Sequence, residues 1–155
     1  MRRSLSLLLI GTLALLVSAC SPGVTPGAVE PNAISYALDP VAASGVDGIV
    51  TFEKMSDTET LVTIEVEGLD PGQTYPAHIH TGNYPDGPVY IPLTPVSGDT
   101  GTSVTMVTTD PNGVAVDYEF LVNYDGFVNV HAPAGSPILA TGETGAGGND
   151  VQVDL

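Results

Sequence analysis

The fold is decided by Leu61–Glu67 (LVTIEVE), which is followed directly by Gly68–Gly72 (GLDPG). Val62, Ile64 and Val66 alternate with Thr and Glu, so one face of this segment is apolar and the other is polar. This period of two is typical of a half-buried β-strand. Proline and glycine then stand where β-turns favour them. The stretch therefore predicts a strand that ends in a tight turn.

Eight further stretches have strand-like patterns, and turn signals such as Asp110–Gly113 (DPNG) separate them. Pro76 indicates an edge or a bulge in its strand. The segment 114–124 is ambiguous and could hold a helical turn, and no stretch has a convincing helical period. The pattern predicts an all-β fold, an antiparallel β-sandwich or Greek-key barrel with few or no helices. The predicted strands are Ala33–Leu38, Gly48–Lys54, Leu61–Glu67, Thr74–Thr81, Val89–Leu93, Thr102–Thr109, Phe127–Ala132, Ile138–Thr141 and Val151–Leu155.

The N-terminus has the organisation of an export signal. Arg2 and Arg3 precede an apolar run, Leu5–Val17, which is too short for a comfortable membrane span. The run leads into Leu16–Cys20 (LVSAC), which resembles a bacterial lipobox, and Cys20 is the only cysteine of the chain, so it cannot form an internal disulfide. We expect a lipoprotein signal peptide at 1–19 and lipidation of Cys20. An ordinary signal peptide with an incidental cysteine stays open.

Lipidation of Cys20 would anchor the protein to a membrane in the bacterial cell envelope, on the periplasmic face or the outer surface. Residues 20–32 are rich in Pro, Gly and small residues and are expected to form a tether. Residues 33–155 are then expected to form a single β-sandwich domain. No feature of the sequence indicates a protein partner.

The charge of the chain excludes some partners. There are 18 Asp or Glu against 3 Lys or Arg, a formal net charge of −15. Nucleic-acid binding needs a basic face, so nucleic acid is excluded as a partner. Removal of residues 1–19 would leave Lys54 as the one side-chain cation against the same 18 carboxylates, a formal charge of −17.

The three histidines are the candidate metal ligands. His78 and His80 are separated by one residue, so on a strand they point to the same face, and His131 ends another predicted strand. Three imidazoles favour copper or zinc. Two other interpretations stay open at this point: polar residues on a solvated strand face, or a histidine hydrogen-bonded to a loop.

Several segments carry a resemblance to known families. Three segments resemble strands of copper/zinc superoxide dismutases and come in the same order as in that family. They are Gly48–Glu53 (GIVTFE), Glu67–Gly72 with the following His78-Ile79-His80, and Val128–His131 (VNVH). Gly135–Gly142 is similar to the C-terminal strand of that family.

The AHIH of Ala77–His80 and the NVH of Asn129–His131 are also similar to the CHRD domain. Both resemblances imply a superoxide-dismutase-like, immunoglobulin-like β-sandwich.

The dismutase resemblance implies that His78, His80 and His131 correspond to three of the four copper ligands. The chain departs from that family elsewhere. No histidine remains to bridge copper and zinc, the interval to His131 is too short for the zinc-bearing loop, and Thr141 replaces the second cysteine of the disulfide. Ile138 stands at or next to the position of the arginine that guides the substrate.

Superoxide is an anion, and its fast capture depends on a positive funnel that this acidic chain cannot build. We therefore expect at best slow dismutation. Candidates for a fourth ligand or an outer contact are Tyr75, Tyr84, Asp86 and Tyr90, although residues 82–87 also fit a simple turn. Methionines at 55 and 106 would favour cuprous copper if they were near, but the pattern around position 106 indicates a core residue.

These observations lead to three hypotheses. The first is a lipid-anchored envelope protein that binds one copper ion, with zinc as the second choice, and that serves copper handling or oxidative protection. The second is a metal-free structural or interaction module of the CHRD type. The third is an active copper superoxide dismutase. Whether the protein is an enzyme is left open, and the charge argues against it.

Overall fold

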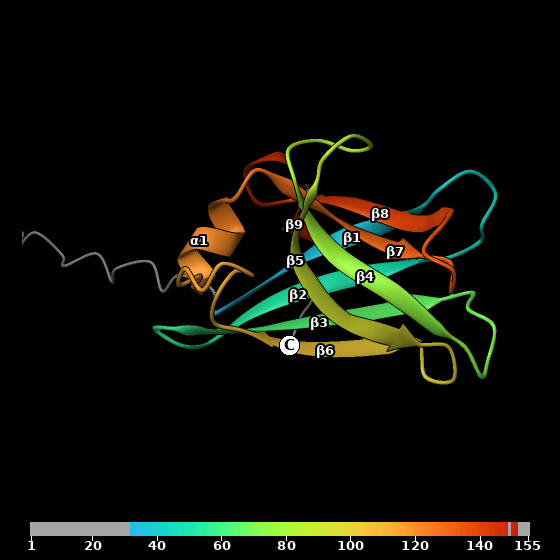
Figure 1. The fold of residues 1–155 in the computed structure, drawn as a ribbon, viewed down its shortest axis with the longest axis horizontal. Helices are drawn as coiled ribbons and strands as arrows, with labels where there is room; N and C mark the ends of the chain where they lie inside the picture. The colour runs from blue at the N-terminus through green and yellow to red at the C-terminus, as the bar shows by residue number, and fades with distance from the viewer. Residues whose placement is uncertain (1–31, 149, 152–155) are drawn as a thin grey trace, which may run out of the picture. The chain divides into compact units, whose positions relative to one another are not determined.

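Short antiparallel strands joined by tight turns build nearly all of the fold, as the alternation of apolar residues predicts (Figure 1). The computed structural model describes residues 32–148 and 150–151. The strands are β1 (Ala33–Pro40), β2 (Asp47–Ser56), β3 (Glu59–Glu67), β4 (Thr74–Thr81), β5 (Val89–Ser97), β6 (Thr102–Val107), β7 (Gly126–His131), β8 (Ile138–Thr144) and β9 (Asp150–Val151), with a helix α1 (Tyr118–Asn123) and a 3₁₀ turn η1 (Gly145–Gly147).

The strands form one sheet in the order β5-β4-β7-β8-β1-β2-β3-β6, and β9 pairs with β1. The neighbours β4 and β7, and β3 and β6, are not consecutive in sequence, an arrangement typical of Greek-key folds. The sheet curls until its end strands β5 and β6 approach each other (Figure 1), where the Thr94 backbone N–H donates to the Thr105 hydroxyl at 2.8 Å. The result is a nearly closed barrel, which confirms the predicted all-β class with few helices.

Alternation decides which side chains fill the interior. Val50 and Phe52 of β2 point inward, and the Phe52 ring packs edge-on against Tyr36 with the ring centroids 5.8 Å apart. On β4 and β7, Ile79 pairs in register with Val128, and both are fully buried. The intervening side chains of these two strands therefore lie on the outer face of the barrel.

Local chemistry explains the irregular segments. Asp117 caps α1, because its carboxylate accepts from the Phe120 backbone N–H at 2.8 Å. A helical turn thus occupies part of the segment that the sequence left ambiguous. Pro76 produces the bulge that was one of its two predicted outcomes, since the register of β4 against β5 shifts between Tyr75 and Ala77. Met106 was expected in the core, but it is 48% exposed, so that expectation was wrong.

Most of the N-terminal features predicted from the sequence lie outside the described residues. They are the signal peptide (1–19), Cys20 and the tether (20–32) up to residue 31. Residues 152–155 of the predicted last strand also lie outside them. Within the part of the chain that the structure describes, no helix is long and apolar enough for a bilayer span.

Candidate metal centre

Strand pairing brings the three histidines together. His78 and His80 lie on the outer face of β4, and His131 lies at the end of the adjacent β7. His78 faces Asn129 in register, so His131, two residues farther along β7, lies diagonally across from His78 on the same face. One candidate nitrogen from each imidazole lies within 4.8 Å of the others. The shared face expected for His78 and His80 is therefore present, and the pairing of β4 with β7 adds His131 to it.

A loop carbonyl sets the orientation of His80. The Nδ1 atom of His80 lies 2.8 Å from the Gly87 carbonyl oxygen. A carbonyl oxygen only accepts hydrogen bonds, so Nδ1 carries the proton and Nε2 keeps a free lone pair. The Phe127 ring stacks on His80 with the centroids 4.8 Å apart and 12° between the ring planes. An imidazole held on one nitrogen with the other free is the usual arrangement of a metal-binding histidine.

Four of the other five ring nitrogens are buried without partners. His80 Nε2, His78 Nδ1 and both nitrogens of His131 have no hydrogen bond within the described structure. A buried polar atom left in this state costs about 1–3 kcal/mol. Metal–nitrogen bonds of about 2.0–2.1 Å allow ligand nitrogens up to about 4.2 Å apart, so modest imidazole rotation closes the gap. These residues therefore fit a single transition-metal ion.

Two of the histidines, His78 and His131, are also biased toward the neutral, metal-binding form. Burial lowers the pKa of His78 below its usual 6.5, and the neighbouring His131 and His80 lower it further. Burial and then His80 lower the pKa of His131 in the same way. The Gly135 backbone acts in the opposite direction and raises the pKa of His131. Neither ring nitrogen of His131 makes a hydrogen bond within the described structure.

The loop after β4 does more than turn the chain. Its Gly87 carbonyl holds His80, and Thr81 and Pro88 join its two ends through a backbone hydrogen bond of 3.1 Å. The Tyr84 backbone N–H donates to the Glu143 carboxylate at 3.0 Å. Sequence reasoning treated residues 82–87 as a turn and missed this contact. No sequence signal identifies a backbone carbonyl as the partner of a particular histidine.

The proposed fourth ligands separate into different environments. Tyr75 points into the core, where its hydroxyl exchanges hydrogen bonds with the Asp70 backbone, so its proposed role is wrong. Tyr84 lies nearer the centre, with its ring edge-on to Phe127 at 5.9 Å. Tyr90 stacks on Tyr124 at 4.8 Å as part of another aromatic group.

One polar residue beside the histidines was not singled out from the sequence. Asn129 is only 1% exposed, and its side-chain oxygen has no partner within the described structure. Its position two residues before His131 on a strand is the signal that could have placed it on the same face.

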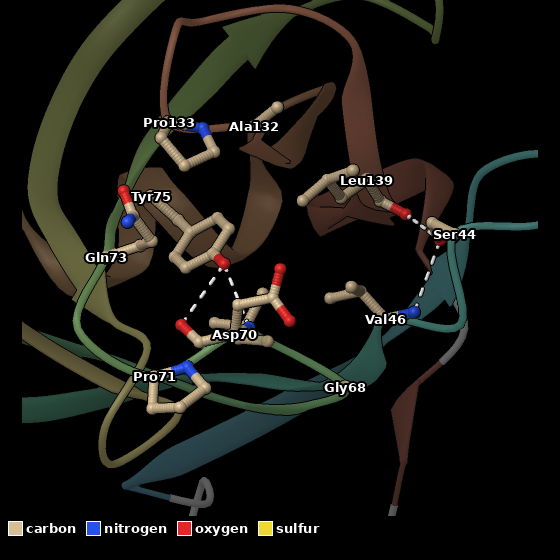
Figure 2. A pocket seen from close by; sticks show the side chains of 11 residues that line it. Ser44, Val46, Gly68, Asp70, Pro71, Gln73, Tyr75, Ala132, Pro133 and Leu139 are labelled. Atoms are coloured by element: carbon tan, nitrogen blue, oxygen red, sulfur yellow. Dashed lines mark hydrogen bonds between the residues drawn. The ribbon is translucent and has the colours of Figure 1, made fainter.

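A separate pocket lies beside the start of β4 and offers different chemistry (Figure 2). Asp70, Tyr75 and Leu139 are among the residues that line it, and none of its lining residues is a histidine. The Asp70 N–H donates to the Tyr75 hydroxyl at 2.9 Å, and Ser44 donates to the Leu139 carbonyl at 2.7 Å, so polar groups there are already engaged (Figure 2).

The Gly87 contact predicts a change that does not depend on any metal. A Cβ at Gly87 would overlap the Thr81 carbonyl and lie 2.6 Å from the Phe127 ring, so Gly87→Ala should displace the carbonyl from His80. Nitrogen-15 NMR of the imidazoles should show a single Nδ1–H tautomer of His80 in the wild type and a mixture in the variant. Gly147→Ala, whose Cβ would meet nothing closer than 3.6 Å, is the control. An unchanged tautomer in Gly87→Ala would contradict this account.

The lowered pKa values predict how the stability of the metal-free protein depends on pH. Below pH 6.5 the unfolded chain binds protons at His78 and His131 that the folded chain resists, so the free energy of unfolding should fall as the pH drops. Urea unfolding at about pH 7.5 and about pH 5 measures this change. His78→Gln with His131→Gln should weaken the pH dependence, since these groups no longer titrate. An equal pH dependence in both proteins would refute the assignment.

Comparison with known proteins adds one match. The model of the CHRD domain matches residues 33–137, a range that includes β1 to β7 and all three histidines. No curated protein and no solved structure matches the chain. Because the family model covers more than half of the sequence, the chain belongs to the CHRD domain family.

Proposed function

We propose that this protein binds a single copper ion through His78, His80 and His131. The observation that carries the proposal is the convergence of one ring nitrogen from each histidine within 4.8 Å, in a cluster where four of the six ring nitrogens are buried without a hydrogen-bond partner. A bound cation would supply the missing partner of each lone pair. Three imidazoles suit both copper and zinc, and copper is favoured by its higher place in the affinity order of divalent metals and by the resemblance to dismutases.

The charge distribution supports cation capture and opposes anion chemistry. Lys54 is the one Lys or Arg after residue 3, and its ammonium lies 3.5 Å from Asp57 and 3.8 Å from Glu119. Among the residues that the structure describes, no cationic side chain is therefore free to draw an anion such as superoxide toward the histidines. When bound, copper would supply Lewis-acid or one-electron chemistry, while the protein supplies neutral imidazoles and a fixed His80.

The proposed setting is the bacterial cell envelope, with the β-domain of residues 33–155 held to a membrane through lipidated Cys20 and the tether 20–32. The proposed role there is copper handling or oxidative protection by a superoxide-dismutase-like domain. The alternative is a metal-free interaction module, which the CHRD family membership alone would equally allow.

Metal analysis of the full chain, purified in detergent and loaded with copper or zinc, tests the proposal. We expect one copper per chain, and loss of at least about tenfold in affinity for His78→Ala with His131→Ala, because two of three ligands are removed. Met55→Ala with Met106→Ala should bind like the wild type, since both methionines are about half exposed and lie on β2 and β6, neither of which pairs with β4 or β7.

A wild-type chain that stays metal-free after incubation with copper would contradict the copper proposal and favour the metal-free interaction module. A dismutase assay on the loaded protein separates the third hypothesis. Slow turnover is expected from the charge distribution, and a rate near the diffusion limit would show that the electrostatic argument is wrong.

Cys20→Ala tests the anchor. The variant should leave the membrane fraction, because the acylated sulfur is lost, whereas Ser21→Ala should remain there. Mass spectrometry of the wild-type N-terminus should show a chain that begins at an acylated Cys20. A Cys20→Ala protein that still sediments with membranes would remove the support for a lipid anchor.

A further inference from the structure

Asn129 is a buried polar residue next to the histidines, and its chemistry is still unassigned. It is 1% exposed, and its side-chain oxygen has no hydrogen-bond donor within the described structure. Asparagine is seldom buried unless its amide is paired. A buried, unpartnered amide oxygen at this place therefore calls for a ligand.

The sheet register places Asn129 inside the histidine cluster. Its cross-strand partner on β4 is His78, and the residue two positions farther along its own strand is His131. Side chains directly opposite in an antiparallel pair have Cβ atoms about 4.5–5.5 Å apart, and residues i and i+2 share a face. Asn129 thus lies between two of the three proposed metal ligands, on their face of the sheet.

The other neighbours of Asn129 do not satisfy its amide. On β8 its partner is Thr141, whose hydroxyl also lacks a hydrogen bond, so these two side chains are not paired with each other. Along β7 the preceding residue on the same face is Phe127, which offers no polar hydrogen and stacks on His80. A cation held by the histidines would supply the missing partner of the Asn129 amide oxygen.

We propose that the side-chain oxygen of Asn129 is the fourth protein ligand of the metal centre, and that it makes the centre prefer a divalent over a monovalent ion. The inference rests on the proposed metal function. Amide oxygen is a harder donor than imidazole nitrogen or thioether sulfur, and hard donors favour Cu²⁺ or Zn²⁺ over Cu⁺. A site of three imidazoles and one amide oxygen would therefore hold copper best in its oxidised form.

Asn129→Leu is the direct test, because leucine has a similar size and no donor atom. We expect Cu²⁺ affinity to fall by about 10- to 100-fold, Cu⁺ affinity to change much less, and the electron paramagnetic resonance spectrum of the Cu²⁺ form to change. Asn129→Asp keeps an oxygen at the same place and should restore Cu²⁺ binding.

A second measurement separates ligand loss from misfolding. Removal of an unpaired buried amide should leave the melting temperature of metal-free Asn129→Leu equal to or above that of the wild type, while the rise in melting temperature on adding Cu²⁺ should shrink. Thr60→Val is the matched control. Thr60 is fully buried with an unpartnered hydroxyl on β3, away from the histidines, so this change should leave Cu²⁺ binding unaltered.

The outcomes distinguish the two proposals. A wild-type chain that binds no metal overturns the proposed function, and this inference with it. A wild type that binds Cu²⁺, together with an Asn129→Leu variant of the same affinity and the same spectrum, overturns the inference alone. Weaker binding in Asn129→Leu with an unchanged melting temperature and recovery in Asn129→Asp supports it.

Discussion

The antiparallel register between β4 and β7 pairs His78 with Asn129 and His80 with Phe127, and the arrangement of the candidate metal centre follows from it. A shift by one residue would turn the histidines into the core and expose Ile79 and Val128. The burial of these apolar partners therefore holds the polar cluster in place on the outer face. Hydrophobic packing inside the barrel thus determines how the three histidines are arranged on its outer face.

The centre also concentrates groups that the protein alone leaves unsatisfied. Buried imidazole nitrogens and an amide oxygen without hydrogen-bond partners are each unfavourable in a metal-free protein. A bound cation would be a partner for the amide oxygen and for one nitrogen of each imidazole. The chain has 18 carboxylates and one cationic side chain after its first three residues, a charge balance that attracts cations. The same charge balance disfavours an anionic substrate, which is why metal binding and fast dismutation are separate hypotheses for this protein.

Most of the fold was predictable because period-two alternation is a local property. Val62, Ile64 and Val66 are buried as their spacing indicates. The prediction failed where the type of a side chain was given more weight than the face that strand alternation assigns to it. On β6, Ser103 and Val107 are buried whereas Val104 and Met106 are exposed, so Met106 lies on the outer face despite its apolar character. Tyr75 is close to the histidines in sequence, but on a strand it points to the opposite face.

By itself, the sequence determined the all-β class, the same-face placement of His78 and His80, the acidic character, and the lack of a basic face. Strand period and charge are properties of the chain that need no partner. Only the tertiary structure decided that His131 joins the other two histidines, that the Gly87 carbonyl selects the tautomer of His80, and that Asn129 is buried among them. Each of these depends on strand register and loop path, which are set by packing between segments far apart in the sequence.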